Sequence, residues 1–265
     1  MLYIVGTPIG NLKDVTFRAI ETLKSVDYIA CEDTRHSAVF LNSYEIKKPL
    51  ISYHKFNERE CAEKLVEILK SGKNVALISD AGMPIISDPG SVLIQVLIEN
   101  GLEYTVVPGA SAFTSALALS GLDASKFTFL GFLPEKQGER KQMLEKYKDL
   151  DTTLIFYSAP HDVKKDVLSL YSVFGDRKAV SVREITKMHE TVNIFSLKEG
   201  YLGEERGEFV ILVEGKKEDF STLSEEEHIK LYLDKGLDKK EALKRVAKER
   251  GVSKSSLYKY TIEEK

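Results

Sequence analysis

The sequence of 265 residues has few cysteines and no excess of positive charge. Cys31 and Cys61 are its only cysteines, and they lack the Cys-x-x-Cys spacing that zinc and redox sites use. We therefore expect no disulfide scaffold, and a reducing cytoplasmic location. The formal net charge is −3, so any site for a polyanion must come from a local basic patch and not from the whole molecule.

Long apolar runs and targeting patterns are missing as well. No segment approaches the roughly 20 apolar residues that cross a bilayer. The N-terminus offers only a short apolar run with no basic region before it, so we expect neither a membrane span nor a secretory signal. The five histidines are scattered and do not cluster with cysteine or carboxylate at ligand spacing, so no metal site is expected.

The first part of the chain reads as a parallel sheet covered by helices. With 43% hydrophobic and 30% charged residues, the composition is that of a globular protein, and the length suggests about two domains. Up to about residue 117, short β-branched runs alternate with amphipathic segments, as in sheets covered on both faces. Asn57 and Glu60 are expected to form a capping pair at the helix before the fourth strand. The strands are expected at 2–5, 28–31, 50–53, 75–79 and 104–107.

From about residue 121 the pattern changes, because the strands have fewer helices between them. They are expected at 127–132, 154–157, 179–183, 191–195 and 209–213. This pattern predicts a second α/β domain with a mixed sheet. We expect an α/β protein with an N-terminal α/β domain over 1–117, a second α/β domain over 118–220 and a basic helical tail over 221–265.

The loops after the strands are expected to carry the function, because ligands collect at the carboxyl ends of open parallel sheets. The first loop holds Pro8, which removes an amide that a phosphate cradle would use, and it lacks the Gly-x-Gly-x-x-Gly pattern of nicotinamide cofactors. The loop 79–90 contains two prolines and two glycines, which predicts a rigid bend close to a flat ligand, with Asp88 and Pro89 as a turn or helix start. The small residues of 108–112 leave room for an adenosine-sized group, or simply allow close helix packing.

Taken in order, these loops resemble the tetrapyrrole methylase superfamily, and within it the branch that methylates a cytidine 2'-oxygen of 16S ribosomal RNA. The resemblance covers nearly the whole chain. It implies two α/β domains with S-adenosylmethionine in the cleft between them, and a homodimer. It rests on VGTPIGNL (5–12), CEDTR (31–35), SDAGMPIISDPG (79–90), PGASA (108–112), GFLP (131–134), SAPH (158–161) and REITK (183–187).

The same resemblance implies which residues bind the cofactor. Where the tetrapyrrole enzymes usually read Gly-Asp-Pro, this chain has Gly82-Met83-Pro84, and Asp80 would replace the missing carboxylate. Carried over position by position, the cofactor-binding residues are Pro8, Asp80, Ala81, Gly82, Met83, Ile86, Ser111, Ala112, Ser158 and Ile185.

Methyl transfer from a sulfonium requires alignment and exclusion of water, and no metal. A ribose hydroxyl is a poor nucleophile, so either a base takes its proton or a cation stabilises the forming alkoxide. Glu32 and Asp80 are carboxylates that qualify by type, and each candidate has a structural alternative, such as a surface ion pair. The catalytic candidates are Asp33, Arg35, Glu184 and Lys187.

The tail carries the local basic patch. From 234 to 260 there are nine Lys and Arg against four Asp and Glu, a local charge of +5. Ala247, Gly251 and Leu257 have the spacing of a small crossing residue, a turn glycine and a core anchor in a helix-turn-helix. We expect this tail to grip 16S rRNA or the small ribosomal subunit, and the alternative is a solvated helical hairpin. The expected RNA-binding residues are Lys244, Arg245, Lys248, Arg250, Lys254, Tyr258 and Lys259.

Two other functions compete with RNA ribose methylation. A small-molecule methylase acting on a corrinoid or porphyrinoid would need no basic tail, so deletion of residues 222–265 should abolish RNA methylation but spare small-molecule turnover. A nucleic-acid-binding regulator with a silent core would have no affinity for S-adenosylmethionine.

Overall fold

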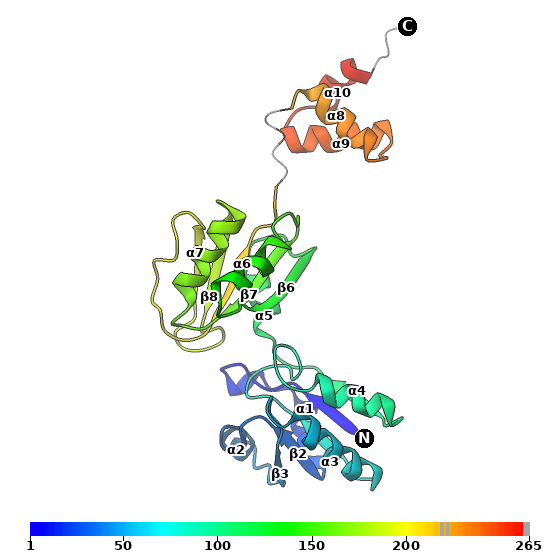
Figure 1. The fold of residues 1–265 in the computed structure, drawn as a ribbon, viewed down its shortest axis with the longest axis vertical. Coiled ribbons are helices and arrows are strands. Elements are labelled where there is room, and N and C mark those ends of the chain that lie inside the picture. The colour runs from blue at the N-terminus through cyan, green and yellow to red at the C-terminus, as the bar shows by residue number, and fades with distance from the viewer. Residues whose placement is uncertain (218–219, 221–222, 262–265) are drawn as a thin grey trace. The chain divides into compact units, whose positions relative to one another are not determined.

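Sheet A consists of five parallel strands in the order β3-β2-β4-β1-β5 (Figure 1). It belongs to a computed structural model that describes residues 1–217, 220 and 223–261. All five strands lie within the predicted ranges, with β3 ending one residue and β4 two residues earlier than predicted, because each is a short apolar run that ends at a turn signal. The bounds are β1 (Leu2–Val5), β2 (Tyr28–Cys31), β3 (Leu50–Ser52), β4 (Val75–Leu77) and β5 (Tyr104–Val107).

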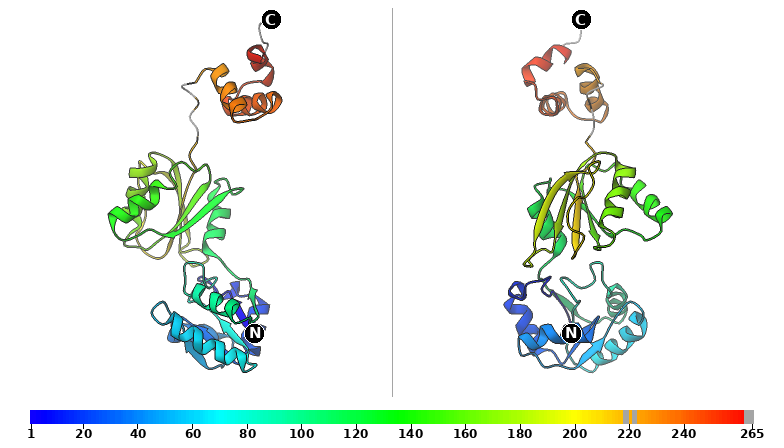
Figure 2. Two further views of the ribbon diagram at one scale, coloured as in Figure 1. Left: turned by 45° about the vertical axis from the view of Figure 1, so that its right-hand side comes forward. Right: turned by 90° about the vertical axis from the view of Figure 1, so that its left-hand side faces the viewer.

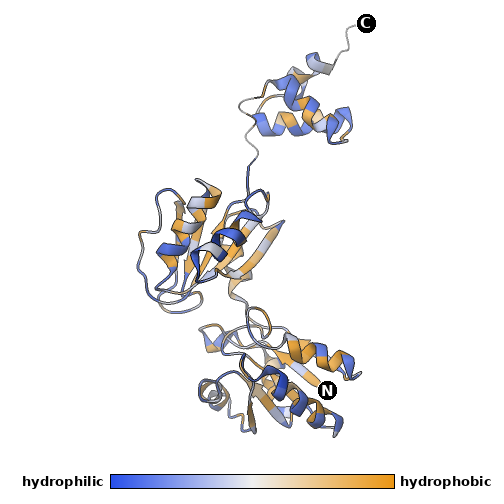
Figure 3. Ribbon diagram, in the orientation of Figure 1, coloured by the Kyte–Doolittle hydropathy of each residue, from blue (hydrophilic) through white to orange (hydrophobic). Residues whose placement is uncertain are grey.

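Helices cover both faces of sheet A, as predicted. Successive strand residues point to opposite faces, so Val75 and Leu77 of β4 pack with α3 and α4, while Ala76 packs with α1 and α2. Figure 3 shows hydrophobic and hydrophilic residues alternating along these helices. The elements are η1 (Leu12–Asp14), α1 (Phe17–Ser25), α2 (Thr34–Ser43), α3 (Glu58–Lys70) and α4 (Ser91–Glu99).

The helix before the fourth strand starts at Asn57 as predicted, but the predicted capping pair does not form, and the predicted helix start at Asp88 is wrong. Asn57 is the N-cap residue of α3, but its side chain makes no capping bond. Its Oδ1 accepts from the His54 N–H at 2.8 Å and its Nδ2 donates to the Ser52 carbonyl at 3.0 Å, so the local turn competes with the cap. Helix α4 begins at Ser91 after Gly90, which leaves Asp88 outside the helix.

Sheet B is mixed, as predicted, with the order β6-β7-β10-β8-β9. Strands β6 and β7 are parallel, and the other pairs are antiparallel. Helix α5 packs on one face and helices α6 and α7 on the other (Figure 2). The elements are α5 (Ala112–Ser120), β6 (Phe127–Phe132), α6 (Gln137–Glu145), β7 (Thr153–Ser158), α7 (Val163–Phe174), β8 (Lys178–Arg183), β9 (Thr191–Ser196) and β10 (Phe209–Val213).

Both sheets lie in one compact unit, Met1–Lys216, and a second unit spans Lys217–Lys265. The second unit is the predicted helical tail, with its own core around Ile229, Tyr232 and Leu257. The proposed boundaries at 117 and 220 remain predictions. The described helices include none that is both long and apolar enough to cross a membrane. The tail elements are α8 (Glu225–Asp234), α9 (Lys239–Arg250), α10 (Lys254–Leu257) and η2 (Tyr258–Thr261).

Candidate functional site

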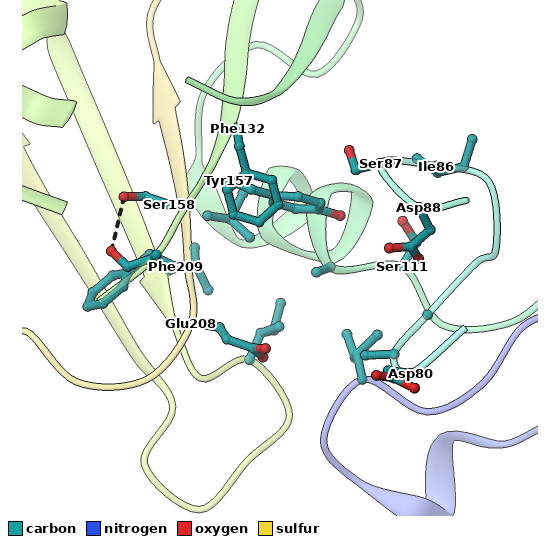
Figure 4. A pocket seen from close by; sticks show the side chains of 18 of the residues that line it. Asp80, Ile86, Ser87, Asp88, Ser111, Phe132, Tyr157, Ser158, Glu208 and Phe209 are labelled. Atoms are coloured by element: carbon teal, nitrogen blue, oxygen red, sulfur yellow. Dashed lines mark hydrogen bonds between the residues drawn. The ribbon is translucent and has the colours of Figure 1, made fainter. Parts of the chain in front are cut away.

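A cavity of about 410 Å³ lies within the first unit, among loops that leave both sheets (Figure 4). From sheet A it receives the loop after β1, the loop between β4 and α4, and the start of α5. From sheet B it receives the ends of β6 and β7, the residue Ile185 after β8, and the start of β10. Loops far apart in sequence therefore build one site.

The sheet A loops are held together by a close backbone approach. A Cβ atom on Gly6 would lie 2.7 Å from the Gly109 Cα, so glycine is required where the loops after β1 and β5 touch. Thr7 joins the β1 loop to the β4 loop, because its N–H donates to the Gly82 carbonyl at 2.9 Å and its Oγ1 donates to the Ser79 carbonyl at 3.2 Å. These contacts fix one wall of the cavity.

The loop between β4 and α4 is strained, and it aims polar side chains into the cavity. Ile85 and Ser87 adopt left-handed φ values of 78° and 66°, which are unfavourable for residues with a Cβ. Such strain persists only where the surroundings enforce it, and it is commonest at functional sites. Figure 4 shows Asp80, Ser87 and Asp88 from this loop facing the cavity.

The structure brings together nearly all of the residues expected to bind the cofactor. Pro8 is the exception, since its neighbour Ile9 takes the lining position. The cofactor role of all ten residues stays a proposal. The nine that line the cavity are Asp80, Ala81, Gly82, Met83, Ile86, Ser111, Ala112, Ser158 and Ile185.

Asp33 and Arg35, two of the catalytic candidates, pair with each other outside the cavity lining. The Arg35 guanidinium lies 3.0 Å from the Asp33 carboxylate, and the Arg35 side chain is 90% exposed. Asp33 is the N-cap of α2 and accepts from the N–H groups of Arg35 and His36. Hydrogen bonds from Arg35 lower the pKa of Asp33 to about 2, which makes this carboxylate a weak base.

Glu184 and Lys187, the other two candidates, form a cluster at the edge of the cavity. Lys187 Nζ lies 2.9 Å from Glu184 and 2.9 Å from Glu208, and Glu208 lines the cavity. Burial alone would raise the pKa of Glu184, but hydrogen bonds from Lys187 and from the Glu208 N–H lower it. Burial alone would lower the pKa of Lys187, but pairing with Glu184 and Glu208 raises it. Both groups are therefore charged and mutually neutralised.

Asp88 is a cavity carboxylate that the sequence reasoning assigned to a turn or helix start. Burial raises its pKa to about 6, the nearby carboxylates Glu32 and Asp80 add to this rise, and a hydrogen bond with Ser79 opposes it. The sequence contained one signal, because Gly90 and Ser91 offer a later helix start. A helix that begins there leaves Asp88 in the loop that lines the cavity.

An aromatic wall was also missed. The rings of Phe132 and Tyr157 lie 5.4 Å apart between centroids, at the ends of β6 and β7, and both line the cavity. Burial raises the pKa of Tyr157, and the Asp88 and Glu208 carboxylates raise it further, while a hydrogen bond from the Phe113 N–H lowers it. The phenol therefore stays neutral at physiological pH. The tyrosine before the SAPH motif was the available signal.

Behind the sheet B wall lies a buried ion pair that reaches the cavity through a serine. Ser158 Oγ donates to Asp166 Oδ2 at 2.5 Å, and Arg140 Nη1 donates to Asp166 Oδ1 at 2.5 Å. Arg140 also donates to the Pro134 carbonyl at 3.0 Å. Burial raises the pKa of Asp166, but Ser158 and Arg140 hold its charged form. Because the hydroxyl proton of Ser158 points to Asp166, its lone pairs are available to a donor in the cavity.

The basic residues of the tail differ in how they are engaged. Arg250 donates to His228 Nδ1 at 3.0 Å and to the Leu223 carbonyl, which is a structural arrangement. Arg245 pairs with Glu249 at 3.2 Å. Lys244 and Lys248 are exposed on α9. Lys254 lies over the Tyr258 ring at 5.8 Å, and Lys259 lies over the Tyr260 ring at 4.6 Å.

Neither unit holds a recognisable metal centre within the described ranges, because no three His, Cys, Asp or Glu side chains there are placed to share an ion.

Comparison with known proteins matches residues 1–200 to the family model described as Tetrapyrrole (Corrin/Porphyrin) Methylases. A Bacillus subtilis protein named ribosomal RNA small subunit methyltransferase I is 43% identical over 97% of this chain and 92% of its own length. A Thermotoga maritima protein of the same name is 42% identical over 82% of this chain and 99% of its own length.

Among solved structures, a diphthine synthase has a TM-score of 0.64 at 16% sequence identity. The match covers 83% of this chain and 91% of that chain. At this identity the likeness concerns the fold, and it agrees with the two α/β sheets described above.

Proposed function

Because the chain belongs to the tetrapyrrole methylase family and, within it, to the ribosomal RNA small subunit methyltransferase I family, we propose that it transfers a methyl group from S-adenosylmethionine to the 2'-oxygen of a cytidine in 16S rRNA. The observation that carries this proposal is the cavity, which gathers residues from the matched motifs of both sheets.

The cavity suits S-adenosylmethionine in size and chemistry. Its volume of about 410 Å³ lies within the range of roughly 300–1,000 Å³ that is usual for small-molecule sites. Gly82 and Ala112 leave room for a flat adenosine, and the carboxylates Asp80 and Glu208 favour a ligand with positive charge. When bound, the cofactor supplies a methyl group already activated by its positive sulfur. Ser158 can accept a hydrogen bond from the ligand's amino or hydroxyl groups.

The surrounding loops orient the reaction and keep water away from it. The strained 79–90 loop and the Phe132–Tyr157 wall enclose the cavity from two sides (Figure 4). Alignment of acceptor oxygen, methyl carbon and sulfur is worth several orders of magnitude in rate, because a bimolecular encounter becomes an intramolecular one. Lys187 holds Glu208 at the edge of the cavity, with its own charge balanced by Glu184 and Glu208.

We propose that the exposed Lys244 and Lys248 of α9 contact RNA phosphates. The Thermotoga maritima relative matches over 99% of its own length in 220 aligned residues, which is close to the length of the first unit. A shorter protein thus carries the same name, so the tail adds affinity and is not essential. We accordingly replace the expectation that deletion of 222–265 abolishes RNA methylation: the deletion should raise KM for RNA and leave kcat within a few-fold.

We also propose that the protein is a cytoplasmic homodimer. Its proposed substrate belongs to the ribosome, and β5 is an edge strand that exposes Tyr104 (41%) and Val106 (49%). Exposed apolar edge strands favour pairing with another chain. Val106→Lys should shift sedimentation equilibrium towards the monomer. A monomeric wild-type protein at micromolar concentration would contradict the dimer.

The proposed function is tested with purified protein, labelled S-adenosylmethionine and small ribosomal subunits from cells that lack this protein. We expect label in 16S rRNA, at one nucleotide whose 3' phosphodiester bond resists alkali because the 2'-oxygen is methylated. Label on a base, or label on an added corrinoid but none on RNA, would refute the proposal. Calorimetry with the cofactor alone should show binding, and its absence with and without subunits would exclude an enzyme of this kind.

A further inference from the structure

Asp80, Asp88 and Glu208 are carboxylates of the described cavity lining, and they have different surroundings. Glu208 is paired with Lys187 at 2.9 Å, and its side chain is 74% exposed. Asp80 accepts from the Asp33 N–H at 3.4 Å. Asp88 is partly buried, and the groups around it are acidic or neutral. Of these three cavity carboxylates, Asp88 therefore has the surroundings that stabilise a negative charge least.

The groups that face Asp88 come from three parts of the fold. Glu32 follows β2, Ser79 and Asp80 belong to the loop of Asp88 itself, and Tyr157 is the penultimate residue of β7. Figure 4 shows the Tyr157 hydroxyl and the Asp88 carboxylate pointing toward one another across the cavity. An acceptor hydroxyl placed between them meets a neutral O–H on one side and a carboxylate on the other.

The backbone holds Asp88 in this position. The preceding Ser87 has a left-handed φ of 66°, and Gly90, two residues later, has a φ of 139° and donates its N–H to Glu58 Oε1 at 2.8 Å. A Cβ on Gly131 of β6 would lie 3.1 Å from the Ser87 Oγ, so the strained turn is packed closely against sheet B. A strained turn fixed from several sides is typical of a catalytic group.

We propose that Asp88 is the general base of the reaction, accepting the proton of the RNA hydroxyl as that oxygen is methylated. The inference rests on the proposed function. The hydroxyl oxygen forms a bond to the methyl carbon, and the carbon–sulfur bond breaks with its electron pair remaining on sulfur. The O–H proton passes to an Asp88 carboxylate oxygen and is later released to water. The positive charge of the sulfonium is thereby discharged, and the carboxylate becomes neutral.

The basicity of Asp88 suits this step. A pKa of about 6 leaves the carboxylate ionised at neutral pH while making it a stronger proton acceptor than an ordinary aspartate. Asp33, with a pKa of about 2, is less basic, and the pKa of Glu184 is lowered. Compared with these two carboxylates, Asp88 combines a place in the cavity lining with the higher basicity.

The test is Asp88→Asn, which keeps the shape and removes the base. We expect kcat for methylation of small ribosomal subunits to fall by about 10²- to 10⁴-fold, while calorimetry shows cofactor affinity within a few-fold of wild type. In the wild type, kcat/KM should fall below a midpoint near pH 6, and this acidic limb should be absent in Asp88→Asn. Asp88→Glu, which restores a carboxylate, should recover part of kcat and the acidic limb.

Glu99→Gln is the matched control, because it makes the same chemical change at the exposed far end of α4. It should leave kcat and the pH profile unchanged. An Asp88→Asn enzyme with kcat within threefold of wild type, or with its acidic limb intact, would overturn the assignment, as would a loss of activity explained by lost cofactor binding. If the wild type itself methylates no RNA, the proposed function has failed instead.

Discussion

Removal of the buried carboxylate Asp166 should be the most damaging single change in the sheet B half of the first unit. Asp166→Asn leaves the Arg140 guanidinium, in a residue only 2% exposed, without its counter-charge. Breaking one side of a buried pair costs about 3–5 kcal/mol. Arg140 keeps its bonds to the Pro134 carbonyl and the Ser169 hydroxyl, which places the expected loss near the lower end of that range.

Urea unfolding at pH 7 measures this loss, and thermal unfolding should show a fall in Tm of about 2–4 °C per kcal/mol. The matched control is Glu139→Gln on α6, the helix that carries Arg140; Glu139 is 57% exposed and its partner Lys136 is 81% exposed. An exposed ion pair contributes about 0–1 kcal/mol to stability, so the control should have nearly the free energy of unfolding and the Tm of the wild type.

The double variant Arg140→Met, Asp166→Leu separates stability from function. Replacing a buried ion pair with apolar residues of similar volume is often neutral, so stability should largely return. In the double variant Ser158 loses the acceptor that orients its hydroxyl, so cofactor affinity should be lower than in the wild type even where stability returns. If Asp166→Asn lies within 1 kcal/mol of wild type, the reasoning about charge compensation is refuted.

Three other changes have outcomes that the structure sets. Asp88→Asn should raise Tm at pH 8 but not at pH 4. The pKa of Asp88 is about 6 in the folded protein and 3.8 in the unfolded chain, so the wild type loses stability as pH rises from 3.8 to about 6, and asparagine avoids that loss. Equal Tm differences between variant and wild type at both pH values would contradict this reasoning. Asp33→Asn should leave kcat within a few-fold of wild type. The pKa of Asp33 is about 2 in the folded protein and 3.8 in the unfolded chain, so the ionised carboxylate stabilises the fold at pH 7 and this stabilisation is lost as pH falls from 3.8 to about 2. The difference in Tm between variant and wild type at pH 7 should therefore disappear on acidification. Lys244→Glu with Lys248→Glu should reduce the slope of log RNA affinity against log salt by about 2, and an unchanged slope would remove these lysines from the RNA contact.

The central strands could be predicted from the sequence because they are largely buried on both faces. Runs such as 2–5 and 209–213 are apolar throughout, and the structure gives β1 and β10 those bounds. Helix starts were harder to predict than strands, because a polar side chain near a helix start has several possible hydrogen-bond partners. The spacing of Asn57 and Glu60 fits a capping pair, but the Asn57 side chain bonds to the preceding turn instead. Sequence spacing does not distinguish a capping bond from a bond to the turn.

The cavity could be predicted better than its chemistry. The resemblance implied the residues that now line the cavity, and the parallel strands of sheet A explain why its loops meet at one edge. Residue type alone could not rank the carboxylates, since basicity depends on burial and neighbours. Asp33 and Asp88 are both aspartates in strand-end loops, yet one has a pKa of about 2 and the other of about 6. The pairing of Glu184 with Lys187 likewise appears only in three dimensions.

The tail caps its own helices and has its own core. Ser224 closes α8 with a reciprocal capping box, Asp238 and Ser253 cap the next two helices, and the core around Leu257 is built, among the described residues, from Phe220 onward. The residues that line the cavity all lie in the first unit, so we expect exchange of the tail to leave the cavity intact. With the proposed RNA contact in the tail, affinity for the substrate and methyl transfer would be adjusted by substitutions in separate parts of the chain.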